Sequence, residues 1–283
     1  MAIITISRGC FSHGREIAET VAEMLEYKCV SREILVDASQ LFNVSERKLI
    51  QSIHDAPGIL ERITQGREHY LAYIQAALLE HVRQNNVVYH GHAGHLLLAE
   101  IPNVLKVRVI ADLADRIDLL QQRQNISKEE ALALIQEEDH HRARWTRYLY
   151  KMDLNDPQLY DIVIKIGSLT VPDACHIICK AAQSDTYKTT PELSKALNDL
   201  AITHHLKAAL KPICDAEITA RDGNVRIKVA AQKIRKTGQA SLALRVHIFT
   251  TIQEDLTRQI NEIARKIPGI KDVVINVDLP YYS

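Results

Sequence analysis

The start of the chain places a glycine-containing turn between a strand and a helix. Residues 2–7 form a β-branched run that predicts a strand, and Gly9 interrupts it. From Gly14 onward the apolar residues take a helical spacing, which predicts a helix to about Glu26. The first backbone amides of a helix have no partner within it and attract anions. The sequence therefore predicts an anion site at this turn.

The turn has the spacing of a phosphate-binding loop. Gly9 and Gly14 are separated by four residues, and Arg15 follows as the cation that would neutralise phosphate. Two features depart from the usual pattern, because Arg15 replaces a lysine and Glu16 replaces a metal-ligating hydroxyl. The residues expected to contact a bound phosphate chain are Gly9, Cys10, Phe11, Ser12, His13, Gly14, Arg15 and Glu16.

Three further apolar runs alternate with helical segments. Residues 87–89, 105–110 and 162–166 are strand-like, while residues 32–85 are helical in composition. The helical stretch divides near residues 43–46 and again at a turn over residues 55–58. Such alternation predicts an α/β fold with a parallel sheet flanked by helices.

A second helical stretch begins near Ser127, where Ser127 and Glu130 have the spacing of a capping box. It carries Arg142, Arg144 and Arg147, which form either a solvated face or part of a binding site. Trp145 is interpreted as a packing residue.

Composition limits the class of protein. A chain of 283 residues suits two domains, and 35 acidic residues balance 35 basic ones, so bulk charge does not favour nucleic-acid binding. Five cysteines without a CxxC pair favour a reducing compartment, and Cys175 and Cys179 are interpreted as buried thiols on a helix. No signal peptide or membrane span is recognised, and the expected location is the cytoplasm.

Beyond a polar stretch the pattern changes. Residues 186–191 are the expected linker between a first domain at 1–185 and a second at 192–283. The second domain is predicted to be a small α+β module. Its predicted helices cover 192–210 and 252–266, and its predicted strands cover 216–219, 225–229, 242–250 and 272–277, with an Asp222-Gly223 hairpin turn.

Four motifs carry a resemblance to a known family. The segments 4–8 and 14–18, then 31–35, then 101–105 with 111–116, and finally 156–164 follow in one order across most of residues 1–182. Together they resemble the cytidylate kinase-like family, and the fold that this resemblance implies is the P-loop kinase fold.

The resemblance implies ATP-dependent phosphoryl transfer to a nucleoside monophosphate, with CMP or dCMP as the expected acceptor and ATP and Mg²⁺ as cofactors. Arg15, Arg142 and Arg147 would be catalytic, and Arg116 would lie near bound ATP. Arg32 and His92 would contact the acceptor. No metal-ligating residue is assigned, so Mg²⁺ would be held mainly by phosphates and water.

Several positions depart from the family pattern. Phe11-Ser12-His13-Gly14 stands where Gly-Ser-Gly-Gly is common, Ser31 stands in place of an aspartate, and His92 in place of an arginine. These changes leave two alternatives open: a nucleotide sensor without turnover, and a kinase for another small molecule. His90, His92 and His95 are weighed as a metal site, and one or two of them are preferred as lining of the acceptor pocket.

The last part of the chain resembles a BON domain over roughly residues 195–279. The likeness rests on residues 200–210, the hairpin at 222–227 and residues 267–273. It implies that this module binds a ligand, a partner protein or a membrane surface and performs no chemistry.

Overall fold

The structure is a computed structural model that describes residues 2–54, 66–231, 233–234, 242–278 and 281–282. The chain divides into two compact units, Met1–Thr190 and Pro191–Ser283, and each is considered by itself. Just before the division, Asp185–Tyr187 forms a short 3-10 helix. The Asn103 side chain then donates to the Thr189 hydroxyl at 2.9 Å.

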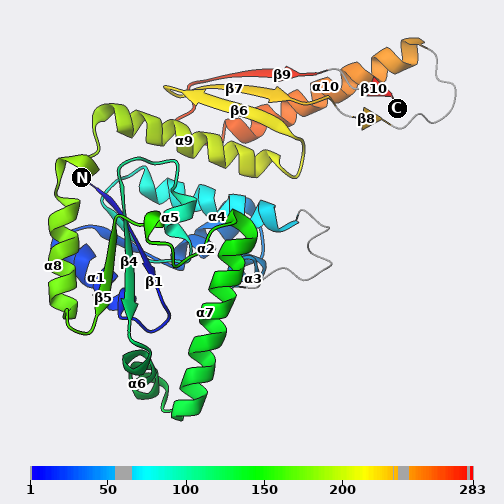
Figure 1. Cartoon of the computed structure of the whole chain (residues 1–283). Coiled ribbons are helices and arrows are strands. Elements are labelled where there is room, and N and C mark those ends of the chain that lie inside the picture. The colour runs from blue at the N-terminus through cyan, green and yellow to red at the C-terminus, as the bar shows by residue number, and fades with distance from the viewer. Residues whose placement is uncertain (1, 55–65, 232, 235–241, 279–280, 283) are drawn as a thin grey trace. The chain divides into compact units, whose positions relative to one another are not determined.

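A five-stranded parallel sheet forms the centre of the first unit, as the sequence predicts (Figure 1). Its strand order is β2-β3-β1-β4-β5. The strand β2 is missing from the prediction because it has three residues and only Val30 is fully buried. The strands are β1 (Ile3–Arg8), β2 (Lys28–Val30), β3 (Val87–Tyr89), β4 (Val104–Ala111) and β5 (Ile162–Ile166).

Helices cover both faces of this sheet, with α8 on one side and α4 on the other in Figure 1. Ile17 and Val21 of α1 pack with Cys175 and Ile178 of α8 over the apolar strand residues. Cys175 and Cys179 are buried, so their interpretation as core thiols is confirmed. The helices of this unit are α1 (Gly14–Leu25), α2 (Glu33–Phe42), α3 (Glu46–His54), α4 (Gly66–Val82), α5 (Gly94–Leu97), α6 (Leu113–Gln124), α7 (Lys128–Tyr150) and α8 (Val171–Ala182).

The predicted capping box starts α7. The backbone amide of Glu130 donates to Ser127 Oγ at 3.2 Å, and the Ser127 amide donates to Glu130 Oε2 at 2.9 Å. Further along, Trp145 is 1% exposed and donates from Nε1 to the Ser52 carbonyl at 2.8 Å. Its packing role is thereby confirmed. The turn predicted over residues 55–58 lies outside the described residues.

The second unit is a three-stranded sheet with two long helices. The strand order is β6-β7-β9, with β6 and β7 antiparallel and β7 and β9 parallel. Asp222 and Gly223 make the predicted hairpin turn with φ of 50° and 80°, and Asp199 accepts both of their amides. Its elements are α9 (Pro191–Leu210), β6 (Ala216–Arg221), β7 (Asn224–Val229), β8 (Lys233–Ile234), α10 (Leu242–Ala264), β9 (Asp272–Val277) and β10 (Tyr281–Tyr282).

The strand predicted over residues 242–250 is wrong, because this segment is the first part of α10. Its β-branched residues suggest a strand, yet Val246 is 55% exposed and Ile248 36% exposed. Thr250 and Thr251 donate from Oγ1 to carbonyls four residues back, which satisfies their hydroxyls within the helix. Burial of Leu256, Ile260 and Ala264 further along anchors the helix on the sheet.

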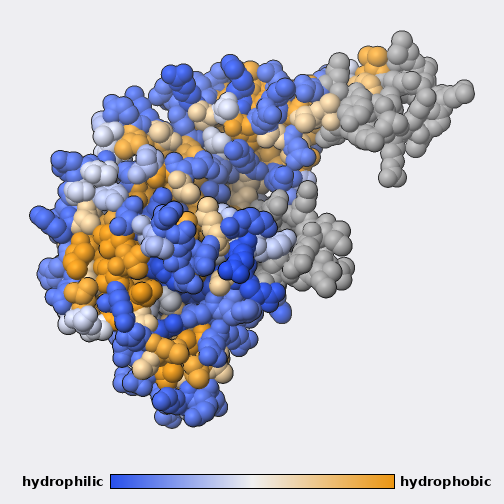
Figure 2. All heavy atoms as spheres, viewed as in Figure 1, coloured by the Kyte–Doolittle hydropathy of each residue, from blue (hydrophilic) through white to orange (hydrophobic). Residues whose placement is uncertain are grey.

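Among the described residues, no helix is both long and apolar enough to span a membrane. On the first unit, Figure 2 shows apolar side chains gathered over the edge strand β5, where Val163 is 44% exposed.

Candidate functional site

The predicted phosphate turn joins the carboxyl end of β1 to α1, at the sheet edge where parallel α/β folds bind ligands. A Cβ atom on Gly14 would lie 2.6 Å from Cβ of Arg8, so the strand and helix can approach this closely only with glycine there. Ser12 is buried and donates to the carbonyls of Gly9 (2.9 Å) and Val109 (3.1 Å). Its hydroxyl therefore braces the turn.

Two turn residues adopt a left-handed backbone without being glycine. Phe11 has φ of 57° and His13 has φ of 60°. These are two positions at which the family sequence commonly has glycine, and a side chain there costs about 1 kcal/mol each. The Phe11 ring packs beside the cluster of Cys10 and Ile117, and His13 Nδ1 pairs with Glu16 Oε2 at 2.9 Å. A cavity remains open over the turn, with Phe11 among its lining residues.

The outer flank of the turn is fastened by Arg116 and Asp139. Arg116 donates from Nε to the Cys10 carbonyl and from Nη2 to Asp139 Oδ2, both at 2.7 Å. Burial disfavours the Arg116 charge, but the hydrogen bond with Asp139 outweighs it and the pKa is raised. Burial and Asp139 together raise the pKa of the Cys10 thiol to about 11. Arg116 thus holds the turn in place. It does not line the cavity over the turn, but with Gly9 and Asp139 it lines a separate cavity of about 270 Å³.

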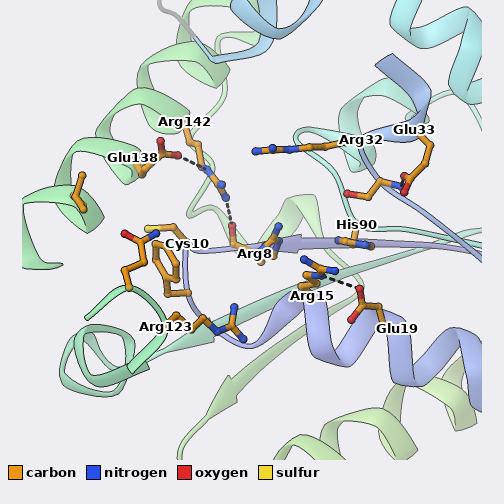
Figure 3. Close-up of a pocket in the computed structure, with 14 residues that line it drawn as sticks. Arg8, Cys10, Arg15, Glu19, Arg32, Glu33, His90, Arg123, Glu138 and Arg142 are labelled. Carbon is orange, nitrogen blue, oxygen red and sulfur yellow. Dashed lines mark hydrogen bonds and ion pairs between the residues drawn. The ribbon is translucent and has the colours of Figure 1, made fainter. Parts of the chain in front are cut away.

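That cavity has a volume of about 590 Å³ and is rich in arginine (Figure 3). Arg32 and Arg142 point toward one another across the space above Arg8 and His90 in Figure 3. The acidic side chains there are already engaged: Glu19 pairs with Arg15 at 2.7 Å, Glu138 lies 3.8 Å from Arg142, and Glu33 accepts the Ser31 amide. The cavity is lined by Arg8, Cys10, Phe11, Arg15, Glu19, Ser31, Arg32, Glu33, His90, Arg123, Gln124, Leu134, Glu138 and Arg142.

Arg8 is the principal site residue that sequence reasoning missed. It ends β1, directly before Gly9, and no carboxylate among the described residues forms an ion pair with it. Burial, reinforced by the nearby charges of Arg142, Arg15 and Arg32, lowers the pKa of Arg8 to about 10. Five arginines and three glutamates line the cavity, and this excess of positive charge favours binding of an anion. The only sequence hint was the position of Arg8 at the strand end.

A second, smaller cavity of about 80 Å³ adjoins the first. Arg8, Ser31, Arg32, His90 and Arg142 line both, so the two cavities meet at these residues. Two residues expected to contact the acceptor, Arg32 and His92, lie here, and the His92 ring sits edge-on to Trp145 with centroids 4.4 Å apart. The remaining lining is Ile34, Leu35, Ile53, Tyr89, Gly91 and His92.

Of the expected turn residues, Cys10, Phe11 and Arg15 line the larger cavity, whereas Gly9, Ser12, His13 and Gly14 line neither cavity. Arg147 and Glu16 also lie apart from this group. Arg147 is 74% exposed, pairs with Asp153 at 4.0 Å and lines neither cavity. Glu16 is 49% exposed, points to His13 and lines neither cavity either. Arg142 is the arginine of α7 that reaches the site, donating from Nη1 to the Arg8 carbonyl at 3.0 Å.

Two of the three histidines after β3, His90 and His92, line the second cavity, whereas His95 does not. His95 is 2% exposed and lies 3.4 Å from the Tyr160 hydroxyl, which also accepts from Arg108 at 3.2 Å. Burial, aided by Arg108, lowers the pKa of His95 to about 4. The structure describes no group of three His, Cys, Asp or Glu residues that could hold a metal.

The buried histidines predict acid sensitivity. The pKa values of His90 and His95 are both about 4 when folded, below the ordinary value of 6.5. Between pH 6.5 and 4 the unfolded chain binds the extra protons, so stability falls as pH falls through this window. Each histidine contributes up to about 1.4 kcal/mol per pH unit, which is about 3 kcal/mol per histidine across the whole window. When the free energy of unfolding is measured by chemical unfolding at pH 4–7, its dependence on pH should be about half as steep in His95→Gln as in the wild type. An unchanged slope would contradict this prediction.

Residues 3–168 match the sequence profile of the cytidylate kinase-like family. The chain is 33% identical to a cytidylate kinase of Sulfolobus acidocaldarius over 96 residues, which is 34% of this chain and 52% of that protein. It thus spans about half the length of the first relatives it matches. With a cytidylate kinase of Saccharolobus islandicus it is 24% identical over 70% of this chain and 99% of the relative.

Among solved structures, an uncharacterised protein from Eubacterium ventriosum has a TM-score of 0.48 and 20% identity, covering 65% of this chain and 99% of its own. A shikimate kinase from Bacteroides thetaiotaomicron has a TM-score of 0.39 and 8% identity, covering 65% and 99%.

Proposed function

Because the chain belongs to the cytidylate kinase-like family, we propose that its first unit transfers the γ-phosphoryl group of ATP to a nucleoside monophosphate, with CMP or dCMP as the acceptor. The observation that carries the proposal is the meeting of two cavities at one set of arginines beside the start of α1. A donor and an acceptor nucleotide need two adjoining sites that share the point of transfer.

The larger cavity is the proposed donor site. Backbone amides of the turn and of the first residues of α1 would contact the phosphate chain, and Arg15 would neutralise it. Arg142 extends from α7 to the shared boundary, where the transferring group would carry its negative charge. Phosphoryl transfer depends mainly on positioning and charge neutralisation, which this arrangement supplies.

The smaller cavity is the proposed acceptor site. Arg32 lines both cavities and would bind the phosphate of the acceptor, while His92 lies deeper, against Trp145. Arginine is suited to this task because its guanidinium forms paired hydrogen bonds with phosphate oxygens. Arg147, assigned to catalysis by the family resemblance, would need α7 to move before it reached the transferred group.

Mg²⁺ fits this site only as a companion of the nucleotide. Ser12, the hydroxyl within the turn, is occupied by two carbonyls, and Glu16 is paired with His13. The nearby carboxylate of Glu19 is paired with Arg15. Phosphate oxygens and water would therefore hold most of the metal, which would supply charge neutralisation when bound.

Turnover tests the proposal. With ATP, Mg²⁺ and CMP, the wild type should form ADP and CDP, and Arg15→Ala should lower kcat/KM about 100-fold because a cation at the phosphate chain is lost. Lys180→Ala removes one exposed charge from α8 and serves as the control with unchanged rate. Absence of product with every monophosphate of a panel would contradict the proposal.

A second candidate is a nucleotide sensor without turnover. It is favoured by the side chains on the left-handed residues Phe11 and His13 and by His92 in place of the usual arginine. The sensor would show a thermal shift with ATP and no product from any acceptor, whereas transfer to an acceptor that is not a nucleotide would identify a different kinase. In either case, binding of a ligand, partner or membrane surface by the second unit stays a prediction.

A further inference from the structure

His90 occupies the boundary of the two cavities. It follows β3 directly and is 4% exposed, and its ring lines both cavities. Its Nδ1 atom is buried, and no hydrogen-bond partner exists for it among the residues that the structure describes. A buried polar atom without a partner costs about 1–3 kcal/mol. His95 Nδ1 shares this state, but His90 also lines both cavities, where a ligand can contact its ring.

Charged groups from four elements face this ring. They are Arg8 at the end of β1, Arg15 and Glu19 of α1, Glu33 of α2, and Arg142 of α7, which shares both cavities with His90. Burial, and next the charge of Arg8, lowers the pKa of His90 to about 4. The imidazole is thus neutral at pH 7 in the unliganded protein, beside a cluster of permanent cations (Figure 3).

We infer that His90 is a phosphate-binding residue at the point of transfer, and that its imidazole takes up one proton from solvent when the phosphate binds. The inference rests on the proposed function in one respect, namely that the phosphate belongs to a nucleotide. A phosphate placed among Arg8, Arg32 and Arg142 offsets the repulsion from Arg8 and attracts the protonated ring, which opposes the effect of burial. The protonated ring then has two N–H donors, one of which donates to a phosphate oxygen.

The arrangement distinguishes this role from that of a core histidine. His95, in the short helix α5 after β3, is also buried, and its Nδ1 likewise has no hydrogen-bond partner among the described residues. Its Nε2, however, lies 3.4 Å from the Tyr160 hydroxyl, and it lines neither cavity. His90 has no such neighbour at hydrogen-bond distance among the described residues, and it borders open space.

Proton uptake measured by calorimetry tests the inference. Inorganic triphosphate, ATP and CMP are titrated separately at pH 7 in two buffers with different ionisation enthalpies. The wild type should take up close to one proton with at least one of these anions, and the arm that shows it identifies the donor or the acceptor phosphate. In His90→Gln, which cannot be protonated, uptake should vanish and affinity should fall about 10-fold. His176→Gln, an exposed histidine on α8, should behave as the wild type.

The outcomes separate this inference from the proposed function. Equal proton uptake in wild type and His90→Gln overturns it, as does failure of all three anions to bind the wild type. Turnover without His90-dependent proton uptake supports the kinase proposal and contradicts the role inferred for His90. His90-dependent proton uptake without turnover supports the role inferred for His90 and contradicts the kinase proposal. The Cε1–H resonance of His90, followed by NMR as the anion is added to the wild type, reports protonation without relying on a folded variant.

Discussion

Replacing Arg8 with methionine should stabilise the unliganded protein and remove most of its affinity for triphosphate. The charge of Arg8 is disfavoured by burial and by three neighbouring arginines, and its pKa is lowered to about 10. Methionine keeps an apolar stem beside Gly14 and removes the charge. After allowance for solvent screening, the free energy of unfolding should rise by about 2 kcal/mol. Affinity for inorganic triphosphate should fall about 1000-fold, as measured by calorimetry.

Arg108 on the neighbouring strand β4 provides a matched control, because its replacement by methionine should change stability in the opposite direction. It is 7% exposed and donates to the Tyr160 hydroxyl at 3.2 Å and to Asn155 Oδ1 at 2.8 Å. Arg108→Met should therefore destabilise the fold by about 2–4 kcal/mol, because it removes two hydrogen bonds of a charged donor, one of them to the buried hydroxyl of Tyr160. If Arg8→Met also lost stability, the account of an unbalanced cationic cluster would be wrong.

Gly14→Ala should damage both the fold and the site. The added methyl group would lie 2.6 Å from Cβ and 2.7 Å from Cδ of Arg8, so β1 and α1 would have to separate. We expect a loss of about 2–3 kcal/mol in the free energy of unfolding, although alanine is the better helix former by about 1 kcal/mol. Triphosphate affinity should fall with it, since Arg8 and the first turn of α1 are displaced together.

Gly9→Ala provides the comparison within the same turn. The nearest atom to an added methyl group there is Cζ of Arg116 at 3.6 Å, an ordinary contact distance. Its stability should stay within about 0.5 kcal/mol of the wild type. Denaturant unfolding of the two variants measures the difference; equal losses for both would show that loop flexibility, not the close approach of Arg8, explains the glycine at position 14.

The sheet and the turn could be predicted because their patterns are local. The β-branched run before Gly9 and the helical spacing after Gly14 each follow from a few neighbouring residues, and both are present in the structure. The strand β2 is too short for such a pattern. Residues 242–250 show the opposite failure, since a β-branched pattern was overridden by the core contacts of the same helix further along.

The site was harder to predict because it depends on which side chains meet. Arg8 ends β1 and His90 follows β3, and only the parallel pairing of β1 with β3 brings those strand ends together. The family resemblance pointed to Arg142 and Arg147 of α7, but helical geometry turns Arg142 inward and Arg147 outward. Arg116 was expected near the nucleotide, and its hydrogen bonds with Cys10 and Asp139 emerge only from the packing of α6 and α7 beside the turn.

The fastening of the turn by Arg116 and Asp139 has a mechanical consequence. Glycines would let a loop of this kind adopt its bends unaided, whereas Phe11 and His13 resist them. The curvature is therefore imposed from outside, by Arg116 on α6 and by Asp139 on α7. Asp139 and Arg142 belong to one helix. A rotation of α7 would therefore move the support of the phosphate turn and the Arg142 guanidinium together.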